Sequence, residues 1–178
     1  MKMNRTAIAL AAIMLAGAGA LHAQDPNLLA KNMKDSWTNL RDLFVKMADK
    51  MPAEEYRFKA TPEVQDFGVR MGHAIQFMMR GCATAAGEQK PLTISAAPTK
   101  PEIVAAMKDA AAECDTVFGA LTDADLMKTI TAGRGGPRLK QAVLQGTVLE
   151  HSQEMYGYLA VYLRLKGIVP PSSDHNER

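Results

Sequence analysis

The sequence predicts an all-α protein built as a four-helix bundle. Four long stretches place apolar residues three and four positions apart, which is the spacing of an amphipathic helix. Between the second and third stretches, residues 87–98 contain glycine, prolines and small residues, and this connection is long enough to cross the height of a bundle. We find no alternating strand pattern and no internal repeat. A length of 178 residues suits a single domain.

The N-terminus has the three parts of a secretory signal peptide. Lys2 and Arg5 form a basic start, residues 7–21 are an apolar run, and Leu21-His22-Ala23 forms a cleavage site. We predict cleavage after Ala23, with Ala20 as the second choice, so residues 1–23 are the signal peptide. The apolar run is short for a stable membrane span. The mature protein is therefore expected to be periplasmic or secreted.

Signal cleavage changes the charge balance. The removed segment carries Lys2 and Arg5 and no acid, so the formal net charge falls from +2 to zero. A neutral chain has no basic excess with which to hold nucleic acid phosphates, so we expect no nucleic acid partner. No second apolar run could span a bilayer, and we expect no membrane association after cleavage.

The first two helices are bounded by prolines. The first is capped by Asp25, ends at Pro52, and carries a buried stripe of Met33, Trp37, Leu40, Phe44, Met47 and Met51. The second is expected to open at Thr61-Pro62-Glu63. It is apolar on two faces, and His73 lies almost opposite its main apolar row, in line with Val69, Phe77 and Arg80.

The third helix is expected to open with a capping box at Thr99-Lys100-Pro101-Glu102. Residues 131–137 form a glycine-rich loop that lacks the Gly-Lys-Ser/Thr ending of a phosphate loop and has no strand in front of it. The fourth helix is predicted over residues 138–166. Its buried stripe contains Leu144, Val148, His151, Met155, Tyr158 and Tyr162.

Two cysteines, Cys82 and Cys114, remain in a chain that we expect to be exported. An even count in an oxidising compartment favours a disulfide, and two buried free thiols are the alternative. Catalytic thiols are disfavoured because neither cysteine has a basic cluster beside it in the sequence.

The chain resembles the DinB-like (YfiT-like) family, in particular an exported bacterial branch. Four stretches carry the resemblance: residues 51–64, from Met51-Pro52 to Glu63-Val64; Phe67-Gly68 through His73; His151 through Gly157; and residues 162–173, from Tyr162-Leu163-Arg164 to Pro170-Pro171-Ser172-Ser173. It covers the mature chain, as a bundle over residues 24–171 and a loose tail over residues 172–178. The family likeness implies an up-down-down-up bundle, often dimeric, with a divalent metal held by three histidines.

The resemblance also implies which residues would hold the metal. His73 matches the ligand of the second helix and His151 the first ligand of the last helix, while Met155 stands where the third histidine belongs. One interpretation is a working zinc or nickel site in which Glu154, Glu150 or water replaces the missing imidazole. A second is a relic without metal, because a lone histidine on an apolar stripe is usually a hydrogen-bonded core residue. A third is a Cu(I) site, since thioethers are soft ligands.

Two function classes arise from these alternatives. The first is an exported metal-dependent enzyme, a transferase or a hydrolase, acting on an unknown small molecule. The second is a non-catalytic bundle of the same fold that serves as a binding protein. Tyr156, Tyr158 and Arg164 are weaker candidates for a substrate pocket, because aromatic residues at stripe spacing usually pack in the core.

Overall fold

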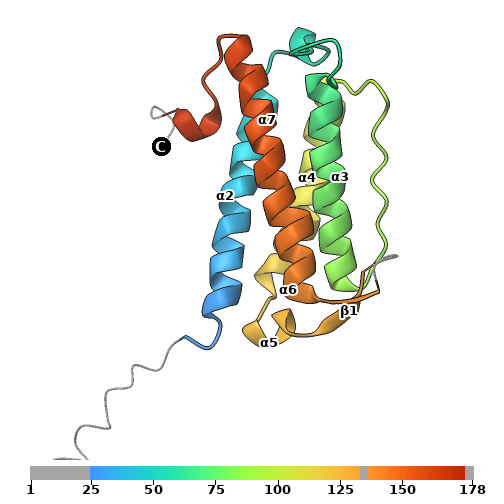
Figure 1. The fold of residues 1–178 in the computed structure, drawn as a ribbon, viewed down its shortest axis with the longest axis vertical. Helices are drawn as coiled ribbons and strands as arrows, with labels where there is room; N and C mark the ends of the chain where they lie inside the picture. Colours follow the sequence, from blue (N-terminus) through green and yellow to red (C-terminus); the bar gives the residue numbers. More distant parts are fainter. Residues whose placement is uncertain (1–24, 133–135, 175–178) are drawn as a thin grey trace, which may run out of the picture.

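The computed structural model describes residues 25–132 and 136–174, so the predicted signal peptide lies outside the described part. The described chain is mostly helical. Three long helices, α2 (Leu28–Lys50), α3 (Phe67–Ala86) and α4 (Lys100–Gly119), lie side by side with a fourth helical column that ends in α7 (His151–Leu165) (Figure 1). No helix in this part of the chain is long and apolar enough to cross a membrane.

Helix α2 buries the predicted stripe. Met33, Trp37, Leu40, Phe44, Met47 and Met51 are all 4% exposed or less. The Trp37 ring stacks on Phe118 of α4 at 5.5 Å between centroids, and its indole nitrogen donates a hydrogen bond to Asp115 at 2.7 Å. Burial of the large indole ring stabilises the fold, and the hydrogen bond to Asp115 means that no polar group of Trp37 is buried without a partner.

Helix α3 begins later than predicted. Residues 61–64 form a turn, closed by the bond from Val64 N to the Thr61 carbonyl, and the helix starts at Phe67. Asp66 is the N-cap: its carboxylate accepts from the Val69 backbone N–H at 2.8 Å, as an N-cap side chain should. The Asp66 carboxylate also forms an ion pair at 2.9 Å with Arg57, a residue that precedes the helix.

A long segment, residues 87–99, returns along the length of α3 to the start of α4 (Figure 1). It begins at Gly87, whose φ of 81° suits glycine, and it is tied to α4 by the ion pair of Lys90 with Glu113 at 2.6 Å. The predicted capping box at α4 lacks the bond from its N-cap side chain. Thr99 makes no side-chain cap bond there, and Glu102 instead accepts from Ser95 N and Oγ at 2.6 and 2.8 Å.

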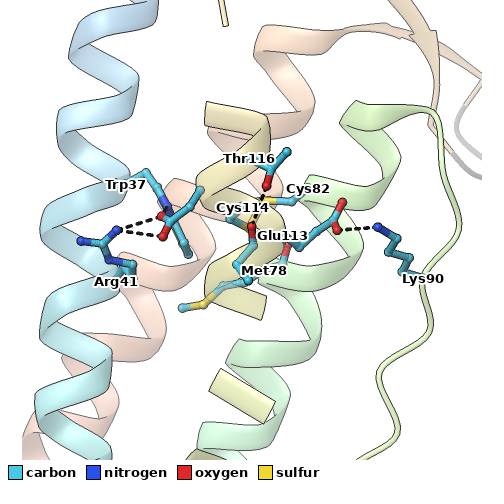
Figure 2. The surroundings of a disulfide bond; sticks show 10 residues. Trp37, Arg41, Met78, Cys82, Lys90, Glu113, Cys114 and Thr116 are labelled. Atoms are coloured by element: carbon cyan, nitrogen blue, oxygen red, sulfur yellow. Dashed lines mark hydrogen bonds and ion pairs between the residues drawn. A yellow bond between two sulfur atoms is a disulfide. The ribbon is translucent and has the colours of Figure 1, made fainter. Parts of the chain in front are cut away.

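A disulfide joins the two helices that flank this segment. Cys82 of α3 and Cys114 of α4 are bonded, with their Cα atoms 5.2 Å apart, and both side chains are fully buried (Figure 2). The alternative of two free thiols is therefore not what the structure contains.

The glycine-rich connection differs from the predicted plain loop. A short helix, α5 (Asp123–Leu126), leads into a two-stranded antiparallel hairpin of β1 (Thr129–Thr131) and β2 (Pro137–Leu139). Glycines 133 and 135 lie outside the described residues. The Asp123 carboxylate accepts hydrogen bonds from the N–H groups of Leu29 and Ala30, so this end of the bundle caps the start of α2.

The last helix is not regular. Residues 138 and 139, predicted as the start of this helix, belong to strand β2. The helical column that follows consists of α6 (Lys140–Val143), a π-helical segment (Leu144–Glu150) and α7. A π-helix widens the turn and shifts the phase of the residues after it. In α7, Met155 and Tyr162 of the predicted stripe are buried, whereas Tyr158 is 49% exposed and its neighbour Leu159 is fully buried.

Residues 172–174, which the sequence assigned to a loose tail, have specific contacts. A short 3₁₀ turn covers Pro171–Ser173, the Ser172 N–H donates to the Tyr156 hydroxyl at 2.8 Å, and Asp174 pairs with Lys50 at 2.7 Å. The remaining tail residues, 175–178, lie outside the described part.

Candidate metal centre

The site begins with one stripe of α3. Residues 70, 73, 77 and 80 are three or four positions apart, so Arg70, His73, Phe77 and Arg80 share a helix face. His151, the first residue of α7, approaches this face from the last helical column. The π-helical segment ends immediately before His151, and such segments are frequent at functional sites.

The two histidines meet through the same ring atom. Nε2 of His73 lies 3.2 Å from Nε2 of His151, although the residues are 78 positions apart in the chain. Two nitrogens bound to one tetrahedral zinc at 2.0–2.1 Å are about 3.3 Å apart. The spacing of these two donors therefore fits a shared divalent ion. Without an ion, it equally fits a hydrogen bond between neutral imidazoles.

Glu154 orients the imidazole of His151 from the other side. Its Oε2 lies 3.5 Å from Nδ1 of His151, and its Oε1 accepts a hydrogen bond from the Tyr158 hydroxyl at 3.1 Å. A carboxylate beside Nδ1 favours a proton on that nitrogen and leaves the Nε2 lone pair for a metal. Glu154 thus lies on the Nδ1 side of His151, away from the position of the ion, and does not replace the missing third ligand. The exposed Glu150 is bonded to Gln145 Nε2 at 3.1 Å.

The third ligand position does not fit a divalent ion. Met155 is buried, and its sulfur lies 3.9 Å from a guanidinium nitrogen of Arg70. Within the described residues, no group of three His, Cys, Asp or Glu side chains could hold a metal. A thioether beside a cation is a poor donor for zinc or nickel. His73 and His151 are therefore suitable ligands for a divalent ion, and Met155 is not.

The electrostatic field around the histidines is positive. The pKa of His73 is lowered, first by burial and then by the nearby His151, Arg70 and Arg80, while Glu154 acts in the opposite direction. Arg70 also lies over the ring of Tyr158, and its buried Nε has no hydrogen-bond partner in the described part of the chain. These two arginines were not among the predicted site residues.

The remaining sequence candidates divide into site and scaffold. Tyr158 belongs to the site through Glu154. Tyr156 does not, because its ring packs edge-on against Phe44 and its hydroxyl accepts from Ser172 N. Arg164 donates to the Ser173 hydroxyl at 3.1 Å and fixes the C-terminal turn.

The described part of the bundle includes a groove and a smaller cavity. A groove of about 440 Å³ runs between α2 and α4 and is lined by Val45, Val104 and Met107, with no histidine in its wall. A smaller cavity of about 220 Å³ includes Arg80 and therefore adjoins the histidine stripe.

The fold and site define a helical-bundle protein with a half-buried pair of facing histidines. The DinB superfamily profile matches residues 36–158. This match covers more than half of the chain, and the protein belongs to the DinB superfamily. Among curated proteins, none matches significantly.

Solved structures have the same fold. A DinB-like protein from Bacillus cereus is 20% identical with a TM-score of 0.65, and the alignment covers 82% of this chain and 97% of that one. A DinB-like protein from Bacillus subtilis is 17% identical with a TM-score of 0.61, over 76% of this chain and 92% of that one. A mycothiol-dependent maleylpyruvate isomerase is 10% identical with a TM-score of 0.56, over 74% and 59%. These identities support a common fold and no more.

Proposed function

We propose that this chain is an exported, metal-dependent member of the DinB superfamily, a transferase or hydrolase whose centre is His73 and His151. The observation that carries the proposal is the 3.2 Å approach of the two Nε2 atoms, at the spacing of two donors on one ion. A bound divalent ion would supply a lowered pKa for a coordinated water or thiol. Export, a small-molecule substrate and a homodimer remain predictions.

The chain's own residues have separable roles in this proposal. His73 and His151 would hold the ion, and Glu154 is a positioning residue that keeps the His151 Nε2 lone pair available. Phe77 packs against both imidazoles, with its ring centroid 4.7 Å from that of His73 and 4.2 Å from that of His151, and would shield one side of the centre from water. An up-down-down-up order of helices is part of the proposal, and the returning segment 87–99 supports it.

A second candidate, a metal-free binding protein, is favoured by one observation. The Arg70 guanidinium contacts the Met155 sulfur, where the resemblance places the third ligand. A fixed positive charge there opposes a divalent cation by ordinary Coulomb repulsion. In this case the two histidines would be hydrogen-bonded to each other. The 220 Å³ cavity beside Arg80 would then bind a ligand without metal chemistry.

Metal titration of the tag-free protein separates the two candidates. We expect Zn²⁺ or Ni²⁺ to bind and to raise the melting temperature, and we expect His151→Ala to abolish both effects. Absence of binding by Zn²⁺, Ni²⁺, Mn²⁺ and Cu⁺ to the natural protein would refute the metal proposal.

A gain-of-ligand variant tests the same site from the other direction. Met155→His restores the third imidazole and should tighten binding of Zn²⁺ or Ni²⁺. The matched control is Met127→His, because Met127 is 63% exposed and its substitution adds an imidazole at a surface position. Tight binding by Met155→His alone, with none in the natural protein, would favour the metal-free candidate on an intact scaffold.

A further inference from the structure

Two arginines meet at the 220 Å³ cavity without an acidic partner. Arg80 comes from α3 and Arg138 from β2, and within the described residues neither guanidinium forms an ion pair with a carboxylate. The other lining residues are small, hydroxyl-bearing or aliphatic: Gly81, Thr84, Ala132, Val143 and Thr147. Guanidinium groups and threonine hydroxyls are donors that match the oxygens of a carboxylate or a phosphate.

The size of the cavity limits what it can hold. Drug-sized ligands occupy sites of about 300–1,000 Å³, and this cavity measures about 220 Å³. It suits one charged group of a few atoms. The helices pack closely at the wall of this cavity, because a Cβ at Gly81 would overlap the Val148 side chain of the π-helical segment.

Arg80 links the cavity to the histidine stripe, because its guanidinium lines the cavity and also lies over the Phe77 ring. The Arg80 guanidinium lies 4.0 Å from the centre of the Phe77 ring, and the same ring lies 4.2 Å from the His151 ring centre. A ligand with its charged end at Arg80 therefore needs to extend only past one aromatic ring to reach the imidazoles. Arg70 and Arg80 place positive charge on both sides of His73 along α3, and this field favours an anion.

We propose that the cavity formed by Arg80, Arg138, Thr84 and Thr147 is a subsite for a small oxyanion group, a carboxylate or a phosphate. The ligand of this protein is then a small anion whose uncharged part extends from Arg80 past the edge of Phe77 toward His73 and His151. The oxyanion subsite stands on its own geometry. Only the assignment of that anion as the substrate rests on the proposed metal-dependent activity.

Direct titration of the full chain tests the subsite. Inorganic phosphate and acetate are added separately to ¹⁵N-labelled protein without metal, with chloride at matched ionic strength as the reference for nonspecific effects. We expect saturable shifts at the amides of Gly81, Thr84 and Thr147. Arg138→Gln should weaken binding about ten-fold, which corresponds to about 1.4 kcal/mol, because a charge-assisted hydrogen bond is lost.

Two further variants control for packing. Arg80→Lys keeps a charge over Phe77 and should retain binding, whereas Arg80→Gln should weaken it. Arg164→Gln removes an exposed arginine at the other end of α7 and should leave binding unchanged. Tighter binding of phosphate identifies a phosphate ester as the ligand, and tighter binding of acetate identifies a carboxylic acid.

The outcomes separate this inference from the proposed activity. Shifts that chloride reproduces, or that Arg138→Gln and Arg80→Gln both leave unchanged, overturn the subsite even if Zn²⁺ binds. Anion binding that persists in His151→Ala, in a protein that holds no metal, supports the subsite while the metal-dependent activity fails.

Discussion

Removal of the Cys82–Cys114 bond should destabilise the bundle by a calculable amount. The two cysteines are 32 residues apart in sequence. In the chain-entropy model, closing a loop of this length restricts the unfolded chain by about 3–4 kcal/mol at 25 °C. For a domain of this size each kcal/mol shifts the melting temperature by about 2–4 °C, so reduction should lower it by roughly 10 °C.

Urea unfolding with and without reductant measures this effect. The control is Cys82→Ala/Cys114→Ala, which should be insensitive to reductant and somewhat less stable than the reduced natural protein, because two fully buried sulfur atoms are lost. Thiol titration establishes that the bond has been reduced. Equal stabilities of the oxidised and the fully reduced natural protein would refute the entropic argument.

Further predictions concern the site helix and the last helix. The pKa of His73 is lower in the folded protein than in the unfolded chain. As the pH falls, the unfolded chain is therefore protonated at this residue before the folded protein is. Stability should therefore be full above about pH 6.5 and fall below it, and His73→Gln should remove this part of the pH dependence. Gly81→Ala should destabilise by about 1–3 kcal/mol, since its Cβ would overlap Val148. Gly157→Ala on the exposed face of α7, where nothing lies within 4 Å of an added Cβ, should stabilise by about 0.5–1 kcal/mol. Ser152→Ala should leave stability unchanged or raise it by about 1 kcal/mol, because the buried hydroxyl has no hydrogen-bond partner among the described residues.

Denaturant unfolding at several pH values checks these four variants. A pH profile of His73→Gln that matches the natural protein would contradict the assignment of the lowered pKa. Equal effects of the two glycine substitutions would show that the close approach at Gly81 is relieved by local repacking.

The helical part of the fold was predictable because burial follows sequence periodicity. Every member of the α2 stripe from Met33 to Met51 is buried, and the connection 87–98 was recognised from its glycine and prolines. The start of α3 was misplaced because Thr61-Pro62-Glu63 has the composition of a helix start. The true cap, Asp66, is distinguished by its tertiary contact with Arg57, which no local pattern contains.

The last helix shows a different limit of periodicity. A stripe extrapolated through residues 144–162 assumes a constant turn, and the π-helical segment breaks that assumption before His151. Within α7 the prediction holds for Met155 and Tyr162 and is wrong for Tyr158, which is exposed while the neighbouring Leu159 takes the buried position. The hairpin was missed because its strands have only three residues each, too short to give an alternating signal.

The candidate site was only partly foreseeable. His73 and His151 came from the family resemblance, and the structure brings their Nε2 atoms together. Arg80 lies on the predicted His73 row without an assigned role, and Arg70 has no role in the sequence prediction. The spacing of Arg70, His73, Phe77 and Arg80 on one helix face was the available signal.

The Cys82–Cys114 bond also closes a covalent ring that contains the whole returning segment 87–99. Exchange of helices between two copies of a bundle requires one connection to open as a hinge. With the ring closed, α3 and α4 of one chain cannot separate, so this connection is unusable for such an exchange. Any swapped dimer of the oxidised protein has to open elsewhere, and one hinged at residues 87–99 forms only after reduction.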